Sequence, residues 1–226
     1  MGGKRNRKEV KPTGELDYTI LSSGSIGNAV RIRNVMIDCG IAFKKMKPEL
    51  YKCQYLLITH DHHDHVNEAT LKQIVQQFPN IKIYSTYKVA RMDDSIIAIN
   101  TDYLPIYLTK AKCNLWAVPV PHNTPCFGYV LKFDDLEILY STDLKNTNDL
   151  SRFTEENGFQ YDYTFLESNY DETKLRMLGD SWHGQYNAYV DSSERHLSRD
   201  ESLKFYVKYR AEGGEYIELH KSNRFY

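Results

Sequence analysis

Short apolar runs recur along most of the chain and predict β-strands, because each run is only a few residues long and is bounded by Gly, Pro, Asn or Asp. The earlier runs lie at Leu16–Leu21, Ala29–Arg33, Val35–Ile37, Tyr55–Ile58 and Ile81–Tyr84. The later runs lie at Leu104–Leu108, Leu115–Val120, Phe127–Phe133, Glu137–Tyr140, Tyr163–Leu166 and Tyr216–Leu219. Asp134 and Asp135 are expected to join two of them as a hairpin. This many strands are enough for two sheets.

The segment that follows the run at Tyr55–Ile58 predicts an amphipathic helix. Asn67 is a suitable N-cap, and the apolar positions after it have the i, i+3, i+4, i+7 spacing of one buried helical face. These positions are Leu71, Ile74, Val75 and Phe78. Pro79 ends the helix, because proline cannot continue it. The residues between this strand and this helix therefore form a strand-to-helix loop.

Ser198 and Glu201 have the spacing of a capping box and predict a second helix near the C-terminus. Its apolar side chains are expected to be Leu203, Tyr206 and Val207. Gly213 and Gly214 are expected to stop it. The preceding segment, Gly179–Arg195, has little periodicity and is interpreted as a long loop that covers a site or meets a partner subunit. Its aromatic residues are Trp182, Tyr186 and Tyr189.

The composition fits one globular domain. Of the 226 residues, 41% are hydrophobic and 13% aromatic, which excludes a disordered polymer. No apolar run approaches the about 20 residues that a membrane-spanning helix needs, and the polar start lacks a secretory signal. The four cysteines form no Cys-x-x-Cys pair, so reduced thiols and a cytoplasmic location are expected, in the host cytoplasm for a phage-encoded member.

The formal net charge of −1 conceals an uneven distribution. Residues 1–12 hold five basic side chains and one acidic side chain, so the remaining residues are net acidic. We interpret residues 1–12 as a flexible basic tail and residues 13–226 as the domain. An acidic body does not favour the broad basic surface that follows a long nucleic-acid backbone.

A cluster of metal-ligand side chains occupies the strand-to-helix loop, at His60, His62, Asp64 and His65. Imidazole nitrogens and carboxylate oxygens are the ligands that zinc and similar divalent ions prefer. A lone histidine is more often a packing or surface residue, but this cluster follows a strand, where α/β proteins commonly place their ligands. We therefore expect this loop to bind metal, with His63 outside the ligand pattern.

The same four residues match the His-x-His-x-Asp-His signature, through which the chain resembles the metallo-β-lactamase superfamily. Further segments resemble the YycJ (WalJ) branch, which is close to the tRNase Z and phosphodiesterase members. They are Ser22–Asn28, Met36–Gly40, Pro121–His122, Ser141–Asp143, Glu167–Asn169, Arg195–Ser198 and Glu218–His220. The resemblance implies an α/β fold, an αββα sandwich of two mixed β-sheets flanked by helices, from about Leu16 onward.

The resemblance also implies a two-metal site. It assigns His60, His62 and His122 to one ion. It assigns Asp64, His65 and His220 to the other, and it places Asp143 between them. Asp143 and His220 each follow a predicted strand, so their positions agree with this assignment. Zn²⁺ is the expected metal and Mn²⁺ the alternative, because ligands of this mixed hardness suit both ions.

Three residues receive roles beyond simple ligation. Asp38 ends a strand and is expected to accept the second N–H of a ligating histidine. Asp64 is expected to take part in catalysis by accepting a proton from water. His196 lies just before a capped helix, whose N-terminus favours phosphate, and the resemblance implies that it is the catalytic histidine that does not bind metal.

The sequence leaves three functions open. The favoured one is a phosphodiesterase that hydrolyses a small cyclic nucleotide, as in the phage anti-Pycsar enzymes, which resemble the YycJ plan. The alternative is a YycJ-like exonuclease on DNA or RNA, which predicts a basic groove. A metal-binding module without catalysis is disfavoured, because structural zinc sites usually close with four ligands. A homodimer is expected, and no membrane is expected as a partner.

Overall fold

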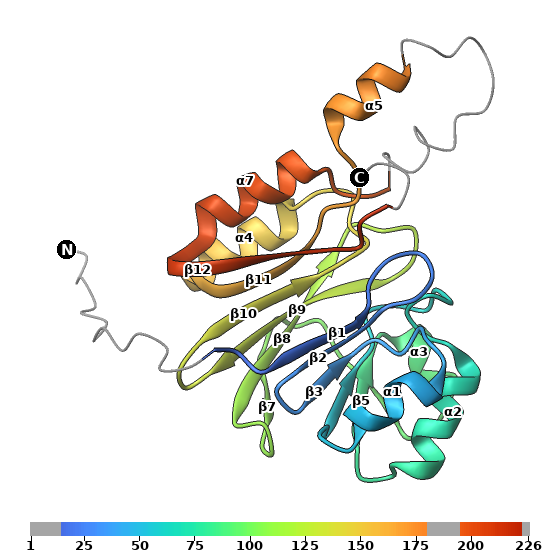
Figure 1. Ribbon diagram of the computed structural model, residues 1–226. Helices are drawn as coiled ribbons and strands as arrows, with labels where there is room; N and C mark the ends of the chain where they lie inside the picture. The colour runs from blue at the N-terminus through green and yellow to red at the C-terminus, as the bar shows by residue number, and fades with distance from the viewer. Residues whose placement is uncertain (1–14, 180–194, 223–226) are drawn as a thin grey trace.

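The computed structural model describes residues 15–179 and 195–222. The described chain forms four layers in the order helices, sheet, sheet, helices (Figure 1). The expected α/β sandwich with two mixed sheets is confirmed. The predicted tail of residues 1–12 lies outside the described residues, as do the aromatic side chains of the predicted loop, Trp182, Tyr186 and Tyr189.

The first sheet has six strands in sequence order, from β1 to β6. Its strands are β1 (Tyr18–Ser22), β2 (Ala29–Ile32), β3 (Val35–Ile37), β4 (Tyr55–Leu57), β5 (Lys82–Ser85) and β6 (Ile96–Ala98). β1, β2 and β3 pair antiparallel, whereas β3 to β6 pair parallel. The carboxyl ends of β3 and β4 therefore lie next to each other at one edge.

The second sheet also has six strands, in the order β12-β11-β10-β9-β8-β7. Its strands are β7 (Ile106–Leu108), β8 (Cys113–Val120), β9 (Cys126–Phe133), β10 (Glu137–Ser141), β11 (Tyr161–Glu167) and β12 (Arg210–Leu219). β7 to β10 pair antiparallel, and β9 and β10 form the predicted hairpin. β10, β11 and β12 are parallel, so three strands of this sheet end side by side.

Helices cover the two outer faces of the sandwich, apart from the helix at Glu172–Gly179, which projects away from it (Figure 1). The helices are α1 (Phe43–Leu50), α2 (Glu68–Gln77), α3 (Tyr87–Ala90), α4 (Asn148–Asn157), α5 (Glu172–Gly179) and α7 (Arg199–Tyr209). α1, α2 and α3 lie on the first sheet, whereas α4 packs on β8 and α7 packs on β11 and β12. Within the described ranges, no helix combines the length and apolar character needed to cross a bilayer.

Three apolar clusters fill the three spaces between the four layers. Side chains alternate between the faces of a strand, so Val35 and Ile37 enter the cluster between the sheets and Met36 enters the cluster beneath α1 and α2. Burying an aliphatic side chain of this size contributes about 1.5–3 kcal/mol. The sandwich thus holds the strand ends at fixed positions, which is what a site built on them requires.

The predicted start of α2 is confirmed, because the Asn67 side chain accepts a hydrogen bond from the backbone N–H of Thr70 at 3.0 Å. The predicted course of α7 is partly wrong. Ser198 caps it as predicted, but the helix ends at Tyr209, and both Gly213 and Gly214 lie within β12. The predicted apolar face is also wrong, since the helix buries Ser202, Phe205 and Tyr209 and leaves Leu203 and Val207 43% and 57% exposed.

Candidate metal centre

The candidate ligands gather where strands of both sheets end. Asp38 follows β3, and the loop from Thr59 to His65 follows β4. In the second sheet Asp143 lies two residues after β10, and His220 directly follows β12. The loop between β8 and β9 adds His122. Parallel strands bring their carboxyl ends to one edge, so residues from distant parts of the chain meet there.

All seven predicted ligands belong to groups whose nitrogen and oxygen atoms lie within 4.8 Å of one another. The first group is His60, His62 and His122. The second is Asp64, His65 and His220. Asp143 joins a third group with His60 and His65 and a fourth with Glu167, His196 and His220. The structure therefore brings together every residue that the sequence predicted as a ligand.

Asp143 is near both predicted ligand sets, because it groups with His60 of the first set and with His65 and His220 of the second. Its Oδ2 atom is 2.6 Å from His65 Nε2 and 3.6 Å from His220 Nε2. Asp64 lies near the same two nitrogen atoms, with its Oδ2 atom 3.6 Å from His65 Nε2 and 3.7 Å from His220 Nε2. Two carboxylates thus face two imidazoles, an arrangement in which the four groups could share a cation.

Several of these nitrogen atoms lack the hydrogen bonds that buried polar atoms normally make. His60 Nε2, His122 Nδ1 and His220 Nε2 are buried without a hydrogen-bond partner among the described residues. Leaving a buried polar atom unpaired costs about 1–3 kcal/mol. Divalent ions bound by the first and second ligand groups would satisfy these atoms, so the donor set fits a metal centre of imidazole and carboxylate ligands.

The charges of the centre are consistent with this fit. Burial lowers the pKa of His60 well below its usual range and that of His122 to about 4, so both imidazoles are neutral and offer lone pairs. Burial alone would also lower the pKa of His65, but the carboxylates of Asp143 and Asp38 outweigh it and raise that pKa to about 10. The negative field that favours a proton on His65 equally favours a metal cation.

Asp38 holds the ligand loop in place, as predicted for an outer partner. Its Oδ2 atom accepts a hydrogen bond from His65 Nδ1 at 2.8 Å, which directs His65 Nε2 toward the centre. Its Oδ1 atom accepts from the backbone N–H and the hydroxyl of Thr59 at 2.8 and 3.0 Å. Asp38 is fully buried, so these donors supply the hydrogen bonds that water would otherwise make to its carboxylate.

Three residues of the centre have strained backbones. Asp38, Asp143 and His220 have φ values of 62°, 56° and 51°, and they are three of the six described residues other than glycine with positive φ. Such a conformation costs about 1–3 kcal/mol per residue and persists only where the surrounding structure enforces it. Half of the described non-glycine residues with positive φ thus lie in this one centre, and strain of this kind is concentrated at functional sites.

The loop between β1 and β2 supports the ligand loop from the other side. The backbone N–H of Asn28 donates to the carbonyl of Asp64 at 2.6 Å, and the Asn28 amide lies 2.9 Å from His65 Nε2. Gly40 passes so close that an added Cβ atom would lie 1.8 Å from the Asp64 carbonyl oxygen. Only glycine permits this approach. The Ser22–Asn28 and Met36–Gly40 segments therefore fix the position of Asp64.

Glu167 is a central residue of the site to which the sequence analysis gave no role. It is fully buried at the end of β11. Its Oε1 atom lies 2.6 Å from His196 Nδ1 and 3.1 Å from His220 Nδ1. Its Oε2 atom accepts hydrogen bonds from the backbone N–H groups of Leu144 and Leu197. Burial would raise the pKa of Glu167, but the two histidines outweigh it and lower that pKa.

His196 lies at the edge of the centre, in the short segment before α7. Its Nδ1 atom donates to Glu167, its ring stacks on His220 with centroids 5.2 Å apart, and its side chain is 15% exposed. Nδ1 is also 3.5 Å from Asp143 Oδ1. Because Glu167 occupies Nδ1, the ring presents Nε2 as its other nitrogen. His63, in contrast, is exposed and contributes to none of the ligand groups.

We predict that Glu167→Gln lowers kcat by about 10- to 100-fold, the usual effect of losing an outer carboxylate. The amide must direct its NH₂ group either at the two backbone N–H groups or at the histidines, so one of these two sets of hydrogen bonds is lost. NMR of the downfield imidazole N–H signals would detect this loss directly. Glu156→Gln, on an exposed face of α4, is the matched control. Full activity with unchanged imidazole signals in Glu167→Gln would contradict the positioning role.

A four-layer sandwich with this histidine and aspartate centre at its strand ends defines the metallo-β-lactamase class of fold. The chain belongs to this superfamily, because the family described as Beta-lactamase superfamily domain matches residues 33–213. No curated protein sequence matches the chain significantly.

Solved structures of the same fold are similar along almost the whole chain. The metallo-β-lactamase fold protein YhfI from Bacillus subtilis superposes with a TM-score of 0.67 at 16% identity, covering 91% of this chain and 86% of YhfI. The short form of human tRNase Z superposes with a TM-score of 0.62 at 16% identity, covering 92% of this chain and 93% of tRNase Z. A diphosphatase from the PhnP family superposes with a TM-score of 0.63 at 18% identity, covering 92% of this chain and 87% of the diphosphatase. Identities this low show a shared fold.

Proposed function

We propose that the protein is a metal-dependent phosphodiesterase with two divalent ions. The observation that carries this proposal is the set of seven converging ligand side chains with His196, a histidine oriented by Glu167, beside them. Two ions bound by these ligands would lower the pKa of a shared water molecule and neutralise charge on a phosphate group. A structural site with four ligands would not need this number of residues.

The residues of the chain have separate tasks in this proposal. His60, His62 and His122 hold one ion, and Asp64, His65 and His220 hold the other, with Asp143 shared. Asp64 remains 26% exposed, so it can accept a proton from an attacking water molecule. His196 donates a proton to the leaving oxygen from Nε2, because Glu167 keeps Nδ1 protonated and stabilises the charged ring.

Phosphate esters are favoured over β-lactams and thioesters by the position of His196. Its segment leads into α7, where the Ser198 side chain accepts a hydrogen bond from the backbone N–H of Glu201. The N-terminus of this helix carries positive partial charge, which favours an anionic group nearby. The similar structures include enzymes whose names state action on phosphate compounds, tRNase Z and a diphosphatase.

The substrate class that we favour is a small cyclic nucleotide, as in the anti-Pycsar enzymes, with a YycJ-like exonuclease as the alternative. The net charge of −1, with its basic excess confined to residues 1–12, supports a small substrate over a long polymer. We further propose Zn²⁺ as the metal, with Mn²⁺ as the alternative, and a cytoplasmic homodimer as the working form.

An assay with Zn²⁺ or Mn²⁺ and three substrate classes tests this proposal. We predict hydrolysis of cyclic mononucleotides, no trimming of single-stranded DNA or RNA, and loss of activity in His62→Ala. His63→Ala is the matched control, because this neighbouring histidine is exposed and outside the ligand groups. Trimming of polymers alone would support the exonuclease, and unchanged hydrolysis by His62→Ala would contradict the metal mechanism.

A further inference from the structure

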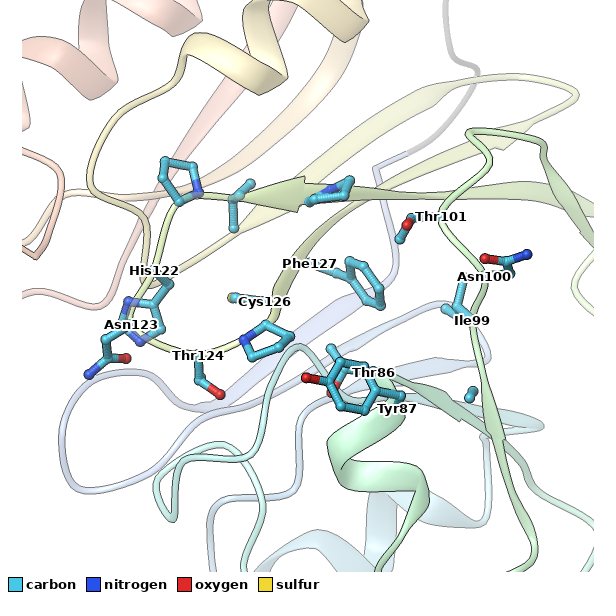
Figure 2. Close-up of a pocket in the computed structure, with 15 residues that line it drawn as sticks. Thr86, Tyr87, Ile99, Asn100, Thr101, His122, Asn123, Thr124, Cys126 and Phe127 are labelled. Atoms are coloured by element: carbon cyan, nitrogen blue, oxygen red, sulfur yellow. The ribbon is translucent and has the colours of Figure 1, made fainter.

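A cavity of about 720 Å³ opens beside the metal centre. Its wall is formed by the start of α3, by residues 98–101 at the end of β6 and just after it, and by residues 119–127 around the β8–β9 loop (Figure 2). His122 belongs both to this wall and to the ligand group of His60 and His62. A molecule that fills the cavity is therefore adjacent to the metal centre. Apart from His122, none of the proposed metal ligands belongs to the cavity wall.

The wall is suited to the uncharged part of a substrate. Its larger apolar contributions come from Ile99, Phe127 and three prolines, and its polar groups are amides, hydroxyls, a thiol and the His122 imidazole. None of the described residues that form it is Asp, Glu, Lys or Arg. Burying a charge against such a wall would be costly, whereas a neutral ring with a few polar atoms meets suitable partners. The phosphate of a substrate therefore belongs at the metals and not here.

Tyr87 provides a flat surface in this cavity. It is the first residue of α3, its side chain is 52% exposed, and it lies in the same wall as Phe127 (Figure 2). Nucleobases stack on such rings, and the interaction tolerates different bases because every base has a π face. The Arg91 guanidinium lies over one face of this ring, 5.5 Å from its centroid, so the opposite face of the exposed tyrosine is the candidate stacking platform.

Polar groups around this ring remain available. Thr86 occupies the N-cap position of α3 but makes no capping hydrogen bond, and its hydroxyl is buried without a partner in the described chain. The exposed amides of Asn100 and Asn123 lie at opposite ends of the cavity (Figure 2). Each amide offers donors and an acceptor, which match the polar edge of a base or the hydroxyls of a sugar.

The wall is linked to the metal-binding loop. The Thr124 hydroxyl, in the wall, donates to Asp61 Oδ1 at 2.6 Å, and Asp61 lies between two proposed ligands. Lys88 on α3 donates to the same Thr124 hydroxyl at 2.8 Å. These contacts fix α3, the β8–β9 loop and the metal loop relative to one another. A substrate that spans cavity and centre is thus held in a defined position.

We propose that this cavity binds the nucleoside part of the substrate, with Tyr87 stacked on the base, while the phosphodiester lies at the metal centre. The inference rests on the proposed phosphodiesterase function and adds the residues that select a nucleotide. A volume of about 720 Å³ is within the range of cavities that enclose small ligands and leaves room for base and sugar.

Two esters with the same leaving group test it, methyl p-nitrophenyl phosphate and thymidine 5′-(p-nitrophenyl phosphate). We predict that Tyr87→Ala raises KM for the thymidine ester about 10-fold, the effect of losing one base–aromatic stack. The KM for the methyl ester and kcat for both esters should change by less than about 2-fold, and Tyr87→Phe, which keeps the ring, should restore KM. Tyr107→Ala, an exposed tyrosine on β7 outside the cavity, is the control.

The outcomes separate this inference from the function on which it rests. Hydrolysis of both esters with a selective KM effect for the thymidine ester supports the inference. Equal effects of Tyr87→Ala on both esters, or no effect on either, overturn the nucleoside assignment and leave the phosphodiesterase intact. Failure to hydrolyse the thymidine ester, while cyclic mononucleotides are hydrolysed with Zn²⁺ or Mn²⁺, overturns this inference alone. Failure to hydrolyse both esters and cyclic mononucleotides overturns the proposed function, and this inference with it.

Discussion

Asp143→Ala is expected to lower kcat/KM for phosphodiester hydrolysis by on the order of 1,000-fold. This loss is larger than the about 10- to 100-fold loss that follows when a residue that only supports a metal ligand is removed. Asp143 groups with His60 of one proposed ligand set and lies 2.6 Å from His65 Nε2 and 3.6 Å from His220 Nε2 of the other. Its pKa stays well below the usual range, because His220 and His65 outweigh the effect of burial, so the native group is anionic.

Activity and metal content must be measured together for this variant. Kinetics with one diester and metal analysis by mass spectrometry should show that Asp143→Ala loses at least one ion per chain. Asp94→Ala, an exposed aspartate remote from the centre, is the matched control for handling and folding. If Asp143→Ala kept two ions and activity within about 10-fold of the native protein, the shared-ligand assignment would be wrong.

His196→Ala is expected to lower kcat by about 10² to 10⁴, the usual contribution of a general acid. The loss should depend on the leaving group. A cyclic nucleotide releases an alkoxide, which needs a proton, whereas p-nitrophenolate leaves without one. The variant should therefore lose much more activity on the cyclic nucleotide than on the p-nitrophenyl ester.

This dependence distinguishes a proton donor from a metal ligand, which matters because His196 also lies in a group with Asp143, Glu167 and His220 that could hold an ion. Loss of a ligand would reduce activity on both substrates and reduce the metal content. His63→Ala is again the matched control. Equal losses on both substrates, accompanied by loss of metal, would assign His196 to ligation instead.

The strands of the sandwich could be predicted from the sequence because their apolar residues are consecutive or alternate within a few positions. Val35–Ile37 was predicted with its observed bounds, and most other strands within two residues. The helices α1, α3, α4 and α5 and the strand β6 were not predicted. α1 carries Phe43, Met46 and Leu50 on one buried face, but Pro48 inside it interrupts the usual helical signal.

The helix α4 had a readable signal, since Leu150, Phe153 and Thr154 have the i, i+3, i+4 spacing of a buried face. The sequence of α7 has two possible apolar faces, one with Leu203 and Val207 and one with Phe205 and Tyr209, and their spacing alone does not show which one is buried. Packing selects the face of Phe205 and Tyr209, because Phe205 stacks near Tyr161 of β11 with ring centroids 6.4 Å apart. Tertiary contact therefore overrode the local pattern in α7.

The candidate centre was more predictable than the helices. Ligand side chains occur at strand ends, and this rule placed Asp143 and His220 correctly beside the histidine loop. The same rule would have identified Glu167, which is the acidic last residue of β11. Its contacts with the imidazoles of His196 and His220 could not be predicted, because only the fold brings these rings close to it. The support from Asn28 could not be predicted, because it depends on a hydrogen bond to the Asp64 carbonyl.

The hydrogen bond from the backbone N–H of His220 to the Ser23 hydroxyl joins residues 197 positions apart and has a consequence for the order of folding. Closing such a long segment costs chain entropy before the contact provides any stabilisation. We therefore expect the centre to be completed late, after apolar packing has docked the two sheets. Bound ions would stabilise the finished fold chiefly by slowing its unfolding, and they would do little to speed its formation.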